Sequence, residues 1–329
     1  MRKLMLSLGL TSTLVLGACP DELPRASLID KLRVLAVRAD QPEVVPGTTV
    51  ALDALVVGHG DTPVTYRWHA CLAPERGRGF FGGGAGTGSS GGNSYAFDAP
   101  LTCAEVYALD PTQALDLGSD AIAALTIPED FLKAENVALA YGLGDFEALP
   151  DELIFGITAI AGVNMTVSLE VQAGDEVVQT FKRVNVSLAP DTNVNPEPPR
   201  FDLRTEDAEE TPVPASDTVS VGSCLPDDAT LSKGTFLLRP LDVPDPPTSY
   251  SVIAGTTDPD EPFRLIETEE VLFYSFFSTE GIFDREIIKS TGTPEASWRF
   301  EEVPSGPIPL WVVVRDGRGG VSWCRSDLP

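Results

Sequence analysis

Short apolar runs, each broken by a proline or glycine turn, are the feature that most limits how this chain can fold. Residues 32–40, LRVLAVRAD, alternate apolar and polar side chains, as a strand with one buried face does. The 28 prolines and 29 glycines supply the many turns that short strands require. We therefore predict an all-β fold class. Further strands are predicted at residues 48–57, 64–69, 137–141, 152–161, 164–172, 176–188, 218–221, 235–239, 249–253, 264–278, 282–289, 296–303 and 308–316.

Two stretches interrupt the strand pattern. Residues 77–92 contain nine glycines and predict a flexible loop. Residues 104–133 have helical character: 121–125 predict a short helix, and 128–132 a second one with proline in its first turn. The apolar run 153–169 predicts a buried hairpin and not a membrane span, because Gly162, Asn164 and two threonines lie within it.

The proline-rich segment APDTNVNPEPPR, residues 189–200, has no apolar periodicity and predicts a linker between two domains. The chain is also long enough for two domains of ordinary size. The first domain would cover residues 30–188 and include the glycine-rich loop and the helical insertion. The second would cover residues 201–329.

The first nineteen residues have the layout of a secretory signal. Arg2 and Lys3 precede an apolar run of about thirteen residues, shorter than the roughly 20 that span a bilayer. The box Leu16-Gly17-Ala18-Cys19 resembles the lipobox of bacterial lipoproteins. The resemblance implies that residues 1–18 are a removed signal peptide, that Cys19 carries diacylglycerol and a fatty acid such as palmitate, and that residues 19–29 tether the body to a membrane.

The function of this segment has alternatives, and one residue indicates which membrane it would reach. An ordinary secretory signal with a cysteine at its junction, or a helix of the fold, remain alternatives to the lipobox. In bacterial lipoproteins, an acidic residue directly after the cysteine favours retention in the inner membrane. Pro20 stands there instead, which indicates the outer membrane.

Two further segments resemble known sandwich domains. A strand, a Val45-Pro46-Gly47 turn, a second strand and the pair Tyr66 and Trp68 near Cys71 are similar to the start of bacterial Ig-like and PKD-like domains. The closing segment LWVVVRDGRGGVSWC resembles the last hairpin of PKD-like or cadherin-like domains. The resemblance implies two Ig-like β-sandwich domains in tandem.

The cysteine count agrees with an oxidising compartment. With Cys19 lipidated, Cys71, Cys103, Cys224 and Cys324 remain, an even number. One disulfide per domain, Cys71–Cys103 and Cys224–Cys324, is the economical pairing. The other two connectivities stay open. No pair has the Cys-x-x-Cys spacing of a metal or redox site.

The charge of the chain limits its partners. Residues 1–18 hold two basic and no acidic side chains, so the rest of the chain has a net charge of −28, against −26 for the whole. So negative a surface disfavours nucleic acid and anionic lipid headgroups. The expected partners are the membrane, through the lipid anchor, and an envelope protein or glycan.

The sequence presents no converging catalytic residues and no metal site. Gly88–Gly92 matches G-x-S-x-G but has glycine where a nucleophile elbow needs a strand and a helix. His59 and His69 lack a second ligand at metal spacing. Adjacent acids such as Glu129/Asp130 and Glu301/Glu302 would point to opposite faces of a strand and not share a substrate.

We therefore expect a non-catalytic binding or scaffolding lipoprotein with no cofactor beyond its acyl chains. One alternative is a hydrolase of envelope polysaccharide or peptidoglycan whose carboxylates meet only in the fold. Another is a calcium-stiffened adhesin, because loops of the second domain carry hard oxygen ligands. These ligands are Asp242, Asp245, Asp258, Asp260 and Glu261.

Overall fold

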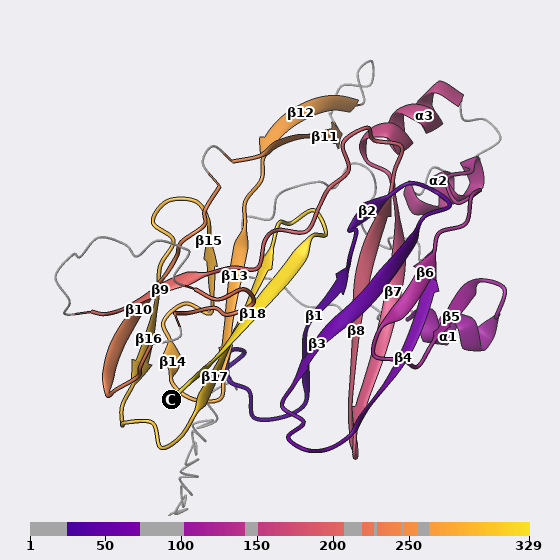
Figure 1. Ribbon diagram of the computed structural model, residues 1–329. Coiled ribbons are helices and arrows are strands. Elements are labelled where there is room, and N and C mark those ends of the chain that lie inside the picture. Colours follow the sequence, from indigo (N-terminus) through magenta and orange to yellow (C-terminus); the bar gives the residue numbers. More distant parts are fainter. Residues whose placement is uncertain are drawn as a thin grey trace, which may run out of the picture.

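The structure, a computed structural model, confirms the all-β fold class: in the described part of the chain, strands in several sheets dominate and three short helices accompany them (Figure 1). Cys19 and the glycine-rich stretch 77–92 lie outside the part of the chain that the structure describes. The described residues are 25–72, 102–141, 151–206, 219–226, 229–244, 247–255 and 263–329.

The part of the chain before residue 189, here called the N-terminal half, forms two facing sheets. Both sheets contribute to one hydrophobic core, which includes Leu52, Trp68 and Val167. The smaller sheet has the order β1 (Arg33–Ala39), β3 (Thr49–Val57), β6 (Ala123–Thr126). The larger has the order β2 (Glu43–Val44), β8 (Glu176–Val186), β7 (Val163–Ala173), β4 (Val64–Cys71), β5 (Ala114–Gly118).

The segments predicted as strands at 48–57, 64–69, 164–172 and 176–188 form strands, as expected. The indole of Trp68 is fully buried and its Nε1 donates to the backbone oxygen of Asp120 at 2.9 Å. A two-residue turn joins β7 to β8, where Gly174 adopts a φ of +59°.

Between β4 and β7, the described residues form three helices: α1 (Cys103–Leu109), α2 (Ala134–Tyr141) and α3 (Asp151–Ile160). The strands predicted at 137–141 and 152–161 are therefore wrong. In α3 the three side chains of Ile154, Ile157 and Thr158 are related by helical spacing, with Ile157 and Thr158 buried. A short run rich in isoleucine and threonine does not by itself separate this spacing from that of a strand.

The helices predicted at 121–125 and 128–132 are also wrong. Residues 123–126 form β6, which pairs antiparallel with β3, and residues 128–132 form turns. Leu125 and Ile127 are fully buried in the core of the N-terminal half, so burial at strand spacing outweighs the helix propensity of the alanines. Among the described residues, no helix is long and apolar enough to cross a bilayer.

The part of the chain after residue 200, here called the C-terminal half, forms a second pair of sheets around an aromatic core. Phe283 stacks on Trp298 with ring centroids 5.2 Å apart. One sheet has the order β14 (Ile282–Phe283), β16 (Ala296–Phe300), β10 (Gly234–Pro240), β9 (Phe201–Thr205). The other has the order β15 (Ile287–Lys289), β13 (Phe273–Ser278), β17 (Ile308–Arg315), β18 (Val321–Leu328).

A separate hairpin of β11 (Ser249–Gly255) and β12 (Phe263–Glu269) lies at the same end of the molecule as α3 (Figure 1). The predicted runs 264–278 and 282–289 each divide into two strands. The strand predicted at 218–221 is wrong over residues 219–221, which form a turn leading to Cys224.

The two halves are packed against each other through a third apolar cluster. It joins Leu35 and Val57 of the first half to Trp311, Val313 and Val321 of the second. The guanidinium of Arg38 lies 4.4 Å from the ring centroid of Trp323, and Arg315 donates to the backbone oxygen of Leu35 at 2.7 Å. Figure 1 shows β1 beside β18, where this contact lies.

The linker predicted at 189–200 contains neither helix nor strand, as expected, but it is held by hydrogen bonds. Asn195 donates to the backbone oxygen of Ala39 at 2.7 Å and accepts from the backbone N–H of Val321 at 2.9 Å. The linker therefore ties β1 to β18.

The end of the predicted tether is also bound to the body. Residues 27–29, here called the strap, run beside β13 of the C-terminal half. Ile29 donates to the oxygen of Ser278 at 2.8 Å, and Ser278 donates to the oxygen of Ser27 at 3.0 Å. The N–H and hydroxyl of Ser27 both donate to Oε1 of Glu286, at 3.1 and 2.8 Å.

Candidate functional site

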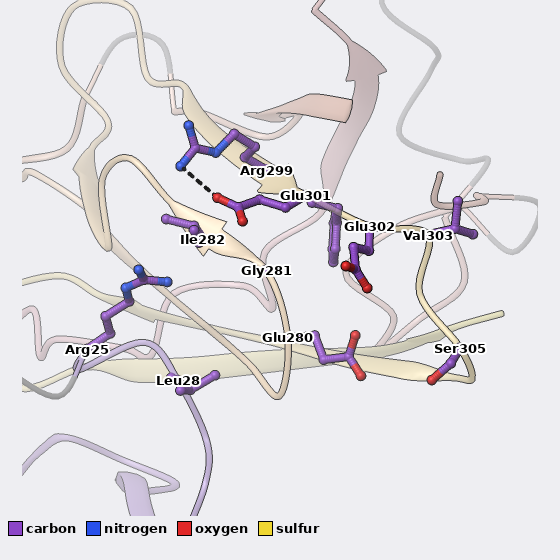
Figure 2. A pocket seen from close by; sticks show the side chains of 11 residues that line it. Arg25, Leu28, Glu280, Gly281, Ile282, Arg299, Glu301, Glu302, Val303 and Ser305 are labelled. Atoms are coloured by element: carbon purple, nitrogen blue, oxygen red, sulfur yellow. Dashed lines mark ion pairs between the residues drawn. The ribbon is translucent and has the colours of Figure 1, made fainter. Parts of the chain in front are cut away.

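A pocket of about 470 Å³ opens where the strap meets the C-terminal half (Figure 2). The strap region contributes Arg25 and Leu28. The turn before β14, the start of β14, the end of β16 and the segment that follows it contribute the other lining residues. They are Glu280, Gly281, Ile282, Arg299, Phe300, Glu301, Glu302, Val303 and Ser305.

Aromatic packing beneath the pocket fixes the turn that lines it. Trp298 is fully buried, and its Nε1 donates to the backbone oxygen of Glu280 at 3.1 Å. Gly281 sits directly on this indole with a φ of +83°, and a Cβ there would lie 2.3 Å from Nε1 of Trp298. A glycine is therefore required at this position for two reasons, backbone conformation and space.

The strap brings a second chain segment to the pocket. Its hydrogen bonds to Ser278 and Glu286 hold Leu28 beside the sheet, and Ile29 is buried in the apolar cluster between the halves. Because Arg25 lies two residues before the strap, the same hydrogen bonds place Arg25 at the pocket. In Figure 2, Arg25 lies on one side of the pocket, while Glu280 and Glu302 lie on the other.

Charged groups of both signs line the pocket. Arg299 and Glu301 form an ion pair at 3.7 Å, in which both side chains are more than half exposed. The side chains of Arg25, Glu280 and Glu302 make no ion pair or hydrogen bond with the described residues. A pocket so lined offers cationic and anionic groups to one ligand at the same time.

The expectation that Glu301 and Glu302 cannot share a substrate assumed that both lie on a strand, and this assumption is wrong. Strand β16 ends at Phe300, so the two glutamates lie in the bend that follows it. The alternation of a strand no longer applies there, and both side chains line the pocket.

A second group of polar side chains, here called the interface cluster, comprises Glu43, Asn193, Asp316 and Arg318. It joins the two halves at the linker. The carboxylate of Glu43 accepts from the backbone N–H of Asn193 at 2.7 Å and lies 3.5 Å from Arg318. Asn193 donates to Oδ2 of Asp316 at 2.7 Å, and Oδ1 of Asp316 accepts from the N–H groups of Arg318 and Gly320.

Other residues of the N-terminal half donate further hydrogen bonds to the carboxylate of Glu43. Its Oε1 accepts from the hydroxyl of Ser187 at 2.7 Å and from the amide of Asn185 at 3.1 Å. Glu43 is 5% exposed, so water cannot replace these donors. Buried polar groups with this many partners serve to hold chain segments together.

Burial shifts the pKa of two ionisable side chains near the interface cluster, Lys182 and Glu270. Burial lowers the pKa of Lys182 to about 8, and Arg315 contributes in the same direction, whereas Asp316 opposes the shift. Lys182 donates to the backbone oxygen of Gly319 in the β17–β18 hairpin. Burial also raises the pKa of Glu270, with a further contribution from Asp316, while Arg318, 3.7 Å away, lowers it.

The four cysteines pair as the economical scheme predicts. Cys71–Cys103 attaches the first residue of α1 to the end of β4, with a Cα–Cα distance of 5.4 Å. Cys224–Cys324 links the turn after residue 219 to β18, with a Cα–Cα distance of 5.0 Å. All four are buried, so the bonds are part of the cores.

The two histidines have local partners. Nδ1 of His59 lies 3.1 Å from the backbone oxygen of Thr62, and the buried ring of His69 packs against Tyr107 with centroids 5.1 Å apart. The described ranges contain no group of three or more His, Cys, Asp or Glu that could hold a metal ion.

The acids proposed for calcium divide between two groups. Asp242 forms an ion pair with Arg200 at 2.7 Å. Asp245, Asp258, Asp260 and Glu261 lie outside the described residues, as does the Gly88–Gly92 match.

The sequence reasoning missed the pocket and the interface cluster. Both combine residues far apart in the chain, such as Arg25 with Arg299 and Glu43 with Asp316. One local signal was available in the sequence, the Asp-Gly-Arg-Gly-Gly segment. The carboxylate of Asp316 in this segment accepts from the N–H groups of Arg318 and Gly320 in the same turn.

No protein-family model matches the chain, and no curated protein matches it either. Among solved structures, it is similar to a mutant of Salmonella alpha-2-macroglobulin, with 11% identity and a TM-score of 0.23, over 94% of this chain and 17% of that one. It is also similar to E. coli alpha-2-macroglobulin in its native conformation, with 11% identity and a TM-score of 0.21, over 91% and 17%. The chain thus spans a small part of the length of these structures.

Proposed function

We propose that this protein is a cell-envelope lipoprotein, anchored through acylated Cys19 in the outer membrane, whose two Ig-like β-sandwich domains act as a binding or scaffolding module without catalysis. One observation carries the non-catalytic part of the proposal. The polar groups of the interface cluster, of which Glu43, Asn193 and Asp316 are buried, form contacts that join the two halves. They are committed to positioning one sandwich against the other.

The disulfides and the strap support the anchored location. Two buried disulfides form where thiols are oxidised, outside the cytosol. The strap binds the segment after Cys19 to β13, so a lipid at Cys19 would hold a fixed end of the body near the membrane. A rigid pair of domains with one fixed end is suited to presenting its other surfaces to an envelope protein or glycan.

A hydrolase would need a different arrangement of carboxylates. Glycoside hydrolysis uses one acid kept protonated by its surroundings and a second one across a cleft. In the pocket, Glu280, Glu301 and Glu302 are exposed to solvent, and Glu301 is paired with Arg299. The pocket is better suited to binding charged groups than to catalysing hydrolysis.

The anchor is tested by labelling cells with radioactive palmitate and separating membranes from soluble fractions. We expect the wild-type protein to be labelled and membrane-bound, and Cys19→Ala to lose the label and to be released from membranes. Ser12→Ala, which leaves the lipobox intact, is the matched control. Label that persists in Cys19→Ala, or an unprocessed Met1 in the natural protein, would contradict the proposal.

The scaffolding role is tested by cross-linking the anchored protein in cells. We expect saturable cross-links to a defined envelope protein or glycan. Hydrolysis of purified peptidoglycan or envelope polysaccharide by the wild-type protein, abolished in Glu302→Gln, would instead establish the enzyme.

A further inference from the structure

The pocket beside the strap carries two kinds of charge that a single small ligand would have to match. Arg25 and Arg299 present guanidinium groups, which bind phosphate oxygens through paired N–H donors. Glu280 and Glu302 present carboxylates, which accept from an ammonium group. Figure 2 places these two glutamates across the pocket from Arg25. A ligand with a phosphate at one end and an amine at the other fits this division.

The position of the pocket relative to Cys19 indicates where such a ligand comes from. Six residue steps separate Cys19 from Arg25, so these residues can span at most about 20 Å. The strap then fixes the chain against β13. If Cys19 is acylated, as the proposed function requires, the pocket is held within reach of the lipid headgroups. Val303, 66% exposed at the pocket, adds an apolar side chain at the same end.

The charge of the whole protein selects among headgroups. A net charge of −28 on residues 19–329 repels anionic lipids at long range. A zwitterionic headgroup carries no net charge and avoids this repulsion, while its two ends can still form separate ion pairs in the pocket. We propose that this pocket binds the phosphoethanolamine headgroup of a lipid in the membrane to which Cys19 anchors the protein, and thereby fixes the orientation of the body on the bilayer.

Weak intrinsic affinity is sufficient for this role. The anchor holds the pocket next to the membrane, so headgroups are present at an effective concentration in the millimolar range or above. The open pocket matches such a site, because the ion pair between Arg299 and Glu301 that lines it is more than half exposed.

The test uses the full, detergent-solubilised lipoprotein and the soluble probe glycerophosphoethanolamine, with binding measured by NMR titration. We expect saturable binding that glycerophosphate or ethanolamine alone does not reproduce. Arg25→Gln and Glu302→Gln should each weaken it by about tenfold. Arg67→Gln should leave the affinity for the probe unchanged. It removes an exposed arginine that pairs with Glu170 in a sheet of the N-terminal half, away from the pocket.

Three results would overturn the inference: no saturable binding, glycerophosphate binding as tightly as the full probe, or binding unaffected by Arg25→Gln and Glu302→Gln. Mass analysis of the same sample separates the two proposals. An acylated Cys19 without probe binding overturns this inference alone. Probe binding by a protein without acyl groups contradicts the proposed anchor and removes the membrane as the source of the ligand.

Discussion

At the scale of single residues, Gly281 shows how one position can serve both the core and the pocket. An alanine there would be strained by the φ of +83° and would also meet the indole of Trp298. We expect Gly281→Ala to lower the free energy of unfolding by roughly 2–4 kcal/mol, from strain and overpacking together. Gly292 has a φ of +78° and no atom within 4 Å of the position that a Cβ would occupy, so it provides the control for strain alone.

Urea denaturation of the two alanine variants measures the difference. Gly292→Ala should cost about 1 kcal/mol, because only the backbone is affected. Equal losses in both variants would mean that the contact with Trp298 relaxes without cost.

Lys182 makes stability depend on pH in the alkaline range. Its pKa in the folded state is about 8, against 10.5 when unperturbed, so between these values the unfolded state binds more protons. The contribution of Lys182 to stability therefore rises from pH 8 to 10.5, by up to about 3 kcal/mol. We expect the stability of the wild type to rise over this window relative to that of Lys182→Met.

Urea denaturation at several values between pH 7 and 10.5 measures this effect. Lys133→Met, at a side chain that is about half exposed, should follow the wild-type profile. Parallel profiles for the wild type and Lys182→Met would show that the burial of Lys182 has no effect on its ionisation.

At the scale of elements, the two disulfides close loops of different length. Cys224–Cys324 spans 100 residues and Cys71–Cys103 spans 32. In the chain-entropy account, the longer loop contributes roughly 4–5 kcal/mol and the shorter roughly 3–4 kcal/mol. We expect the double alanine variant at Cys224 and Cys324 to lose more stability than the one at Cys71 and Cys103.

Thermal denaturation under identical conditions compares the two double variants, whose four cysteines are all buried. The first bond joins a turn to β18 in the core of the C-terminal half, while the second attaches only α1. A larger loss at Cys71 and Cys103 would show that α1 is required for folding of the N-terminal half.

At the scale of the whole molecule, the interface cluster couples two sandwiches that have separate cores. Glu43→Gln would place an amide N–H₂ beside the donors from Ser187 and Asn193 and weaken the contact to Arg318. We expect a loss of roughly 3–5 kcal/mol. In calorimetry, we also expect one unfolding transition to separate into two.

Glu170→Gln is the matched control, since Glu170 pairs at 3.7 Å with an exposed arginine on the outer face of a sheet. Its effect should be below about 1 kcal/mol. A single, unshifted transition in Glu43→Gln would show that the apolar cluster around Trp311 and Val313 is enough to hold the halves together.

Features that depend on neighbouring residues in the chain could be predicted from the amino-acid sequence. Short apolar runs bounded by proline or glycine turns marked β3, β4, β7 and β8 as strands. The even number of cysteines and their division along the chain led to the economical pairing that the structure has.

The remaining features depend on contacts between segments that are far apart in the chain. Residues 137–141 and 152–161 became helices, and residues 123–126 a strand, because packing against the core outweighs the weak local preferences of short apolar runs. The same holds for the pocket and the interface cluster. Arg25 and Arg299 line one pocket, and Glu43 lies 3.5 Å from Arg318, only after the strap and the linker are bound, and no local pattern encodes such placements across more than 270 residues.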